Sequence, residues 1–196
     1  MLRQPEDVRP SALHADGASL PEVEFVAYAI DGRLSGRIRL EASRLSDMLN
    51  DHDEFLLEEV LVERLPEGGA MVVPELLVQR SELILIHATG PRGDRSRRTR
   101  TTAYALELGA GLHRVTGNGH VAPGVDPVVS FRRRGPMVPL TDATIEYRTL
   151  HGPVREFAGT IVVNRDQLDW VKEVESGIQR PDLPGFTNDR TGRGHR

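Results

Sequence analysis

Arginine is the residue type whose placement in this chain most clearly suggests chemistry. Arg95, Arg97, Arg98 and Arg100 lie close together in one short stretch. Clustered guanidinium groups attract phosphates and carboxylates alike, so this stretch is a candidate binding site for nucleic acid or for an acidic protein partner. A solvated linker that docks on an acidic part of the same chain would have the same composition. Both interpretations stay open at this point.

Formal charge is distributed unevenly along the sequence. Residues 22–90 hold 14 acidic and six basic side chains, a formal charge of −8. Residues 91–196 hold 12 acidic and 17 basic side chains, a formal charge of +5. These opposite charges favour docking of the arginine stretch on the first half. They also disfavour RNA binding by the first half, because a negative surface repels the phosphate backbone.

Patterns typical of catalysis or metal binding do not stand out. The sequence contains no cysteine and no Gly-x-Ser-x-Gly motif, which excludes thiolate chemistry and one common signature of serine hydrolases. His113 and His120 lie seven residues apart on one expected strand. They must therefore face opposite sides of it. We expect a protein that is not an enzyme and that uses no cofactor and no metal.

Two further arginines occupy similar turns, in the pairs Gln79-Arg80 and Asn164-Arg165. Each pair follows an apolar stretch, and residues 77–86 return 85 positions later as residues 162–171. In both copies an apolar strand, a polar turn and a second apolar strand follow one another. Self-similarity at a fixed offset predicts a duplicated folding unit.

The elements that must position these turns are short strands. Leucine-rich and β-branched runs separated by turn signals predict an all-β protein. In the first half the expected strands are residues 23–30, 34–40, 55–65, 71–78 and 83–88. In the second half they are residues 103–108, 112–121, 140–148, 155–163 and 168–174. Gly36 and Gly117 fall in corresponding strands, which supports the prediction of two tandem five-stranded units.

One short helix is expected, in the first unit only. Ser43 is placed to cap a helical turn over residues 43–50, whose apolar side chains share one face. The corresponding part of the second unit contains Pro123 and Pro127. Proline lacks an amide hydrogen and clashes with the preceding turn. We therefore expect no helix there and regard the second unit as degenerate.

The first unit resembles the Sm-like family of SH3-type small barrels. The resemblance rests on residues at the first hairpin, in the loop after the second strand and at the arginine turns: Asp31, Gly32, Arg33, Gly36, Asp47, Asn50, Arg80 and Arg165. It covers residues 23–88 well and residues 103–174 loosely, and it implies two tandem five-stranded small barrels. The block at residues 44–50 is also similar to an uncharacterised family of small bacterial β-domains, for which no activity is implied.

The Sm-like resemblance further implies a site for U-rich single-stranded RNA. Its candidate residues lie in the loops: Asp47, Asn50, Gln79, Arg80, Asn164 and Arg165. In such a site an asparagine would hydrogen-bond the edge of a base that stacks on a side chain. The aromatic side chain for stacking is missing here. The alternative is that Asp47 and Asn50 cap the short helix and Arg80 projects from an ordinary hairpin.

These features predict the organisation of the chain and its class of function. The expected segments are a disordered tail (1–21), a first unit (22–90), a basic linker (91–102), a second unit (103–175) and a disordered tail (176–196). A charged N-terminus and the lack of a long apolar stretch predict a cytoplasmic protein that does not contact membranes. Small barrels leave strand edges open. We therefore expect a non-catalytic binding or assembly module whose loops and edges bind a protein partner or a second copy, with U-rich RNA as the alternative.

Overall fold

The computed structural model describes residues 20–30, 32–65, 68–91 and 99–175. The tail expected at 176–196 and nearly all of the tail expected at 1–21 lie outside the described residues. So do Arg95, Arg97 and Arg98 of the basic linker, whereas Arg100 is described and is exposed to solvent. The described part of the chain includes no helix long and apolar enough to cross a membrane.

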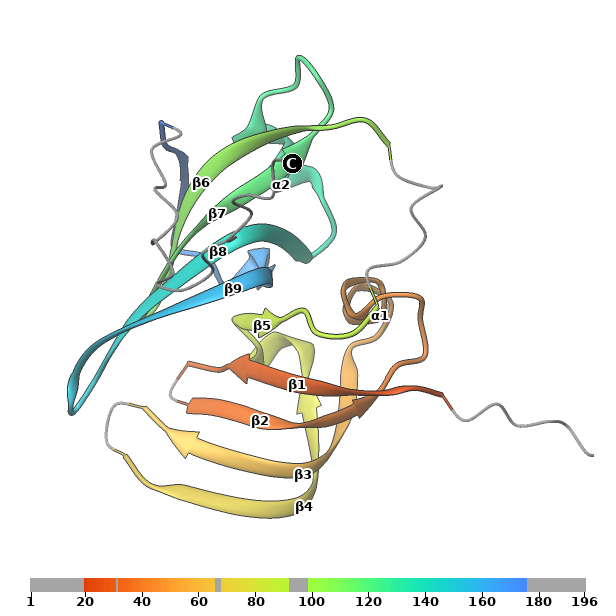
Figure 1. Ribbon diagram of the computed structural model, residues 1–196, viewed down its shortest axis with the longest axis vertical. Coiled ribbons are helices and arrows are strands. Elements are labelled where there is room, and N and C mark those ends of the chain that lie inside the picture. Colours follow the sequence, from red (N-terminus) through yellow and green to blue (C-terminus); the bar gives the residue numbers. More distant parts are fainter. Residues whose placement is uncertain (1–19, 31, 66–67, 92–98, 176–196) are drawn as a thin grey trace, which may run out of the picture.

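The first half of the chain forms five strands and one α-helix (Figure 1). Its elements are β1 (Glu22–Tyr28), β2 (Gly32–Arg39), α1 (Leu45–Asp51), β3 (Glu54–Arg64), β4 (Ala70–Gln79), the 3-10 turn η1 (Arg80–Glu82) and β5 (Leu85–His87). The strands pair antiparallel in the order β5-β1-β2-β3-β4. In β1, buried Val23, Phe25 and Ala27 alternate with more exposed side chains, as the two-residue period of a strand requires.

The second half has the same order of elements. It consists of β6 (Thr102–Ala110), β7 (His113–Val121), α2 (Pro127–Arg133), β8 (Met137–Thr149), β9 (Gly152–Asn164), the 3-10 turn η3 (Arg165–Gln167) and β10 (Trp170–Glu173). Its strands pair antiparallel in the order β10-β6-β7-β8-β9. The all-β prediction is confirmed, and all ten expected strands are present with ends shifted by a few residues.

The prediction of a single helix is wrong. α2 lies between the second and third strands of its half, the place that α1 occupies in the first half. Pro127 is its first residue, where an amide hydrogen would have no partner within the helix. Asp126 caps α2 by accepting a hydrogen bond of 2.7 Å from the Val129 amide. The expected cap of α1 is also wrong, because Arg44 and not Ser43 holds the N-cap position.

Each half has an irregularity at the same place in its sheet. The register shifts at Gly36 where β2 meets β3 and at Gly117 where β7 meets β8. A Cβ atom on Gly36 would lie 2.9 Å from the Glu58 carbonyl oxygen, too close for any residue but glycine. Near these shifts Glu59 and Asp142 adopt φ angles of 53° and 49°. The two halves therefore share local distortions typical of β-bulges as well as strand order.

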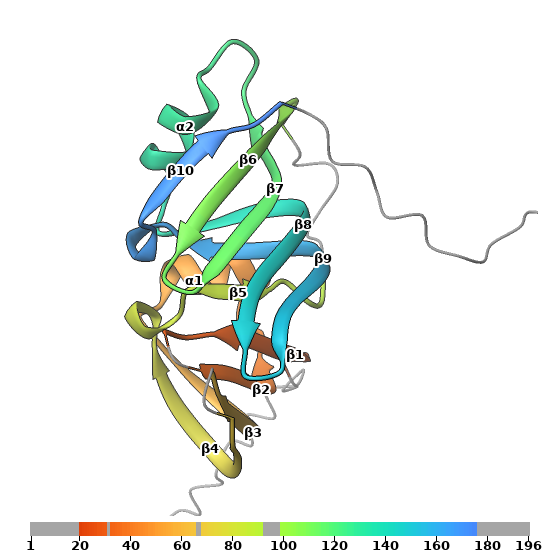
Figure 2. The ribbon, with the colours of Figure 1, turned by 90° about the vertical axis from the view of Figure 1, so that its left-hand side faces the viewer.

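One hydrogen-bonded junction joins the halves. β9 pairs antiparallel with β5, with Val163 opposite Leu85 and Val162 opposite Ile86. The strands thus form one open ten-stranded sheet, in the order β10-β6-β7-β8-β9-β5-β1-β2-β3-β4, and not two sheets that each close on themselves. β4 and β10 lie at opposite ends of the molecule (Figure 2).

The buried apolar side chains form two clusters, and both extend across the junction. Met137 and Val162 of the second half belong to the cluster that α1 covers. Ile84 and Leu85 of the first half belong to the other cluster. Burial of apolar surface therefore holds the halves together in addition to the strand pairing.

Candidate functional site

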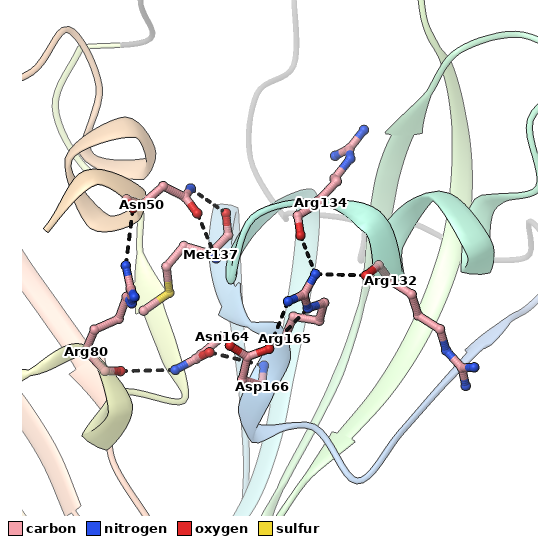
Figure 3. A network of polar contacts seen from close by, with 8 residues as sticks. All are labelled: Asn50, Arg80, Arg132, Arg134, Met137, Asn164, Arg165 and Asp166. Carbon is pink, nitrogen blue, oxygen red and sulfur yellow. Dashed lines mark hydrogen bonds and ion pairs between the residues drawn. The ribbon is translucent and has the colours of Figure 1, made fainter. Parts of the chain in front are cut away.

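Residues predicted from the sequence to bind a ligand lie beside the β9–β5 junction, near the ends of α1 and α2 (Figure 3). Asn50, in the last turn of α1, reaches the backbone of Met137 at the start of β8. Its Nδ2 donates to the Met137 carbonyl oxygen over 2.9 Å and to the Ser46 carbonyl oxygen over 2.8 Å. Its Oδ1 accepts from the Met137 amide over 3.1 Å. Both amide protons of Asn50 are thus used within the chain.

Arg80 and Arg165 perform the same task in the two halves. Arg80 Nη1 donates to two carbonyl oxygens at the C-terminal end of α1, both over 3.2 Å. Arg165 Nη1 donates to two carbonyl oxygens at the end of α2, one of them over 2.8 Å. The four acceptors belong to Asn50, His52, Arg132 and Arg134. Such carbonyls lack partners within the helix and carry partial negative charge, so each guanidinium stabilises a helix end.

Asn164 and Gln79 end the corresponding strands β9 and β4, but their surroundings differ. Asn164 is only 2% exposed, and its Nδ2 donates to the carbonyl oxygens of Arg80 over 3.0 Å and of Leu83 over 2.8 Å. Gln79 is exposed and donates to the Glu54 carboxylate over 2.6 Å. Asn164 therefore ties β9 to the turn before β5, whereas Gln79 contacts only the neighbouring strand of its own hairpin.

Asp47 lies in the first turn of α1 and keeps to local contacts. Its carboxylate accepts a hydrogen bond of 3.3 Å from Ser43 Oγ and lies 3.9 Å from Arg44 Nε. A carboxylate in the first turn also interacts favourably with the positive end of the helix dipole. Asp47 thus supports the start of α1 while Asn50 and Arg80 secure its end.

These contacts bear on the predicted RNA site. The structure does bring Asn50, Arg80, Asn164 and Arg165 into one region (Figure 3). Their side chains donate to carbonyl oxygens of the chain itself. An RNA base would have to displace hydrogen bonds that hold the two halves and the helix ends in place. RNA binding at these residues stays a prediction.

A second polar cluster, which no sequence pattern marks, also links the two halves. Glu156 on β9 accepts hydrogen bonds from the Tyr28 hydroxyl over 2.8 Å and from the Tyr147 hydroxyl over 2.5 Å. Nε2 of His87 lies 3.4 Å from the Tyr28 oxygen. The His113 ring packs edge-on against Tyr28, with 5.2 Å between ring centroids. Tyr28 and Glu156 are 128 residues apart in sequence, so only the β9–β5 junction brings them together.

Burial controls the ionisation of this cluster. Burial, together with the hydrogen bonds to Glu156, raises the pKa of Tyr28 far above its usual value and the pKa of Tyr147 to about 12. Burial opposes ionisation of Glu156, but the hydrogen bonds from the two tyrosines and the nearby positive charge of Arg33 together outweigh it and lower the Glu156 pKa. Burial also lowers the pKa of His87 and of His113. At neutral pH the cluster is therefore one carboxylate bonded to two neutral phenols beside two neutral imidazoles.

The two ends of the sheet form the remaining candidate surface. Among the strands that the structure describes, β4 pairs with β3 alone and β10 pairs with β6 alone. On β4 the side chains of Met71, Val72 and Leu77 are exposed, with Val72 at 75% and Leu77 at 59%. On β10 the ring of Trp170 is exposed and the Lys172 ammonium lies 5.6 Å from its centre. Apolar edge strands of this kind are sites where a further strand adds to a sheet.

The positions of the histidines bear on metal binding. His113 and His120 face opposite sides of β7, as the sequence predicts, with His113 buried and His120 bonded to Thr141 Oγ1 over 2.8 Å. Across residues 20–30, 32–65, 68–91 and 99–175, no three His, Asp or Glu side chains lie close enough together to hold a metal ion.

Comparison with known proteins gives no match. No family model matches the chain, and no curated protein or solved structure is significantly similar to it.

Proposed function

We propose that this chain is a non-catalytic assembly module of the cytoplasm, built from two copies of one Sm-like small-barrel unit, and that it binds a protein partner through an exposed strand edge. Support for two copies comes from the matching strand order, the matching irregularities at Gly36 and Gly117, and the matching arginine contacts at the ends of α1 and α2. The Sm-like identity of the unit rests on the sequence resemblance.

The observation that carries the proposal is the outer edge of β4. This strand is ten residues long and pairs on one side only within the described chain. Backbone amides and carbonyls along such an edge are available to a partner strand, and exposed Met71, Val72 and Leu77 offer apolar surface beside them. Strand addition uses both features at once, since main-chain hydrogen bonds give affinity and side-chain packing gives specificity.

The loops are the weaker candidates for partner binding. Asn50, Arg80, Asn164 and Arg165 donate hydrogen bonds to the chain's own backbone. A ligand that bound to these four side chains would have to displace those hydrogen bonds. Strand addition at β4 leaves the strand pairing of the described sheet in place.

The test is a pair of matched substitutions. Leu77→Lys places a charge on the β4 edge, which disfavours strand addition. Ile30→Lys makes a similar chemical change at a side chain that is 68% exposed in the turn between β1 and β2, away from both edge strands. Each tagged protein is used to capture partners from the native cell, and bound proteins are identified by mass spectrometry. The proposal expects a defined set of proteins that the wild type and Ile30→Lys retain and that Leu77→Lys loses.

The same set of proteins on all three baits would contradict the proposal, because binding would then not involve the β4 edge. Turnover of a small molecule at the Tyr28 cluster would contradict the non-catalytic part. Circular dichroism of both variants serves as the control for folding. Both side chains are largely exposed, so we expect both variants to fold.

A further inference from the structure

The chain contains a template for the contact that β4 would make. We propose that copies of this chain associate head to tail, with β4 of one copy pairing antiparallel with β10 of the next in the register that β9 and β5 use inside the chain. This inference rests on the proposed function and names its partner, a second copy. It would make the β9–β5 junction one instance of a contact that is repeated between chains.

Strand register defines which residues correspond. Gln79 pairs with Glu54 at the end of β4 as Asn164 pairs with Met137 at the end of β9, so β4 corresponds to β9. In the same way, β10 pairs with β6, the first strand of the second half, as β5 pairs with β1, the first strand of the first half. β10 therefore corresponds to β5. The junction pairs are Leu85 with Val163, Ile86 with Val162 and His87 with Ile161. Their counterparts between copies are Trp170 with Val78, Val171 with Leu77 and Lys172 with Leu76.

The apolar side chains of the junction are more buried than their counterparts on the free edges of β4 and β10. Val162 and Ile86 are 0% exposed in the junction. Their counterparts are less covered, since Leu77 is 59% exposed and Val171 is only partly buried. Apolar side chains at corresponding positions are thus buried in the β9–β5 junction and more exposed to solvent on the unpaired edges of β4 and β10. Pairing β4 with β10 would bury both, which is the main driving force for such a contact.

Charge and polar groups favour this head-to-tail pairing over a symmetric pairing of two β4 strands. β4 belongs to the unit of residues 22–90, with a formal charge of −8, and β10 to the unit of residues 103–175, whose nine acidic and eight basic side chains give a formal charge of −1. Two β4 strands side by side would bring two strongly negative units together, whereas β4 against β10 brings only one. Gln79 would also take the position of Asn164, with its amide directed to the carbonyls of Arg165 and Leu168 in place of those of Arg80 and Leu83.

One pair in this register is unfavourable and makes the proposal more specific. Thr160 and Ala88 share a hydrogen bond of 3.0 Å in the junction. Their counterparts at the edges are Glu75 and Glu173, two carboxylates that would face each other. Like charges directly opposite one another weaken strand pairing. The proposal therefore expects reversible association that strengthens when Glu75 is replaced by threonine.

The experiment uses the natural absence of cysteine. Two full-length proteins are made, Leu76→Cys and Lys172→Cys, and are mixed under mild oxidation. This pair corresponds to His87 and Ile161, whose backbones exchange no hydrogen bond and lie close enough for a disulfide. The proposal expects a disulfide between the two different proteins. Val72→Cys in place of Leu76→Cys is the control, because it lies about 13 Å further along the strand and should link at least tenfold more slowly.

Sedimentation analysis supplies the second readout. We expect association of the wild type to weaken at least tenfold in Leu77→Lys, to be unchanged in Ile30→Lys and to strengthen about fivefold in Glu75→Thr, in line with the usual size of cross-strand pair effects. A disulfide of Leu76→Cys with itself, equal linking of Val72→Cys, or a wild type that stays monomeric at millimolar concentration would overturn the inference. If the wild type is monomeric but Leu77→Lys still loses captured proteins, this inference fails and the proposed function stands. If Leu77→Lys changes neither measurement, both fail.

Discussion

The end of β9 and the end of β4 show how much the surroundings of a residue decide its role. Asn164 and Gln79 hold corresponding positions, both carry side-chain amides, and both precede an arginine that binds a helix end. Asn164 is buried because β5 pairs with its strand, and it donates to two carbonyls of the other half. Gln79 is exposed at the edge. Similar local structure thus yields a structural contact in one place and an unused surface in the other.

The largest expected loss of stability comes from replacing Asn164, the buried member of this pair of corresponding residues. Asn164→Ala removes the donor to the carbonyls of Arg80 and Leu83. Leaving buried carbonyls without partners should lower the free energy of unfolding by about 3 kcal/mol. Gln79→Ala, at the corresponding exposed position, should change it by less than about 0.5 kcal/mol. Urea unfolding of both variants measures the difference, and equal losses would show that the two positions are energetically alike.

Asn50 extends the comparison to the helices. Asn50→Ala removes both hydrogen bonds to the Met137 backbone and should lower the free energy of unfolding by about 2 kcal/mol. Arg132 is the corresponding residue of α2 and its side chain is exposed, so Arg132→Ala should cost less than about 0.5 kcal/mol. Chemical unfolding provides the values. A stable Asn50→Ala protein that loses salt-sensitive binding of U-rich RNA would instead favour the RNA site.

Arg80 and Arg165 test the opposite case, because substitutions at these two corresponding positions should lower the free energy of unfolding equally. Arg80→Ala and Arg165→Ala each remove a guanidinium from two carbonyls at a helix end. Each should lower the free energy of unfolding by about 1.5 kcal/mol, the usual worth of hydrogen bonds from a charged group. Lysine at either position should recover only part of the loss, since an ammonium lacks the planar fork of donors. Losses that differ by more than about 1 kcal/mol would argue against equivalent roles.

The next expected effect appears only at acidic pH. The pKa of His113 in the folded protein lies below its ordinary value of 6.5 because the ring is buried. The unfolded chain therefore binds more protons as the pH falls below about 6.5, and stability decreases towards acid by up to about 1.4 kcal/mol per pH unit. His113→Phe should remove this part of the slope between pH 6.5 and pH 5. Unfolding at a series of pH values checks it, and an unchanged slope would mean that His113 does not titrate with folding.

Glu156 should add a separate acid-sensitive contribution at lower pH. Its folded pKa lies below the ordinary value of 4.5. Its stabilising effect is therefore complete well above pH 4.5 and is lost as the pH falls through the folded value. Glu156→Gln should flatten the stability curve in that lower window while leaving the His113 part in place.

Local patterns allowed most of the fold to be predicted. Alternation of apolar residues and turn signals located all ten strands, because both depend on neighbours in sequence. α2 was missed because Pro127 was treated as an interior residue of the helix, whereas it occupies the first position, where proline fits. The continuous sheet was missed because the pairing of β9 with β5 depends on contacts between distant segments.

The candidate site was less predictable for the same reason. Arg80 and Arg165 were identified as a corresponding pair from the repeated turns, but their acceptors are carbonyls that no sequence pattern marks. Asn164 was grouped with the possible ligand-binding residues, although burial at the junction gives it partners within the chain. Tyr28 and Glu156 meet only across the junction. The open edge of β4 was expected in general terms, and the strand order locates it.

Amide hydrogen exchange followed by NMR at increasing protein concentration tests the central claim most directly. In the junction, the outward-facing amides of β9 and β5 at Val162 and Ile86 belong to a directly opposed pair. Their counterparts at the free edges are the amides of Leu77 and Val171. If copies pair through β4 and β10, exchange at Leu77 and Val171 slows as the concentration rises, while exchange in β1 and β2 does not change. Rapid exchange at both amides at every concentration would contradict assembly through these edges.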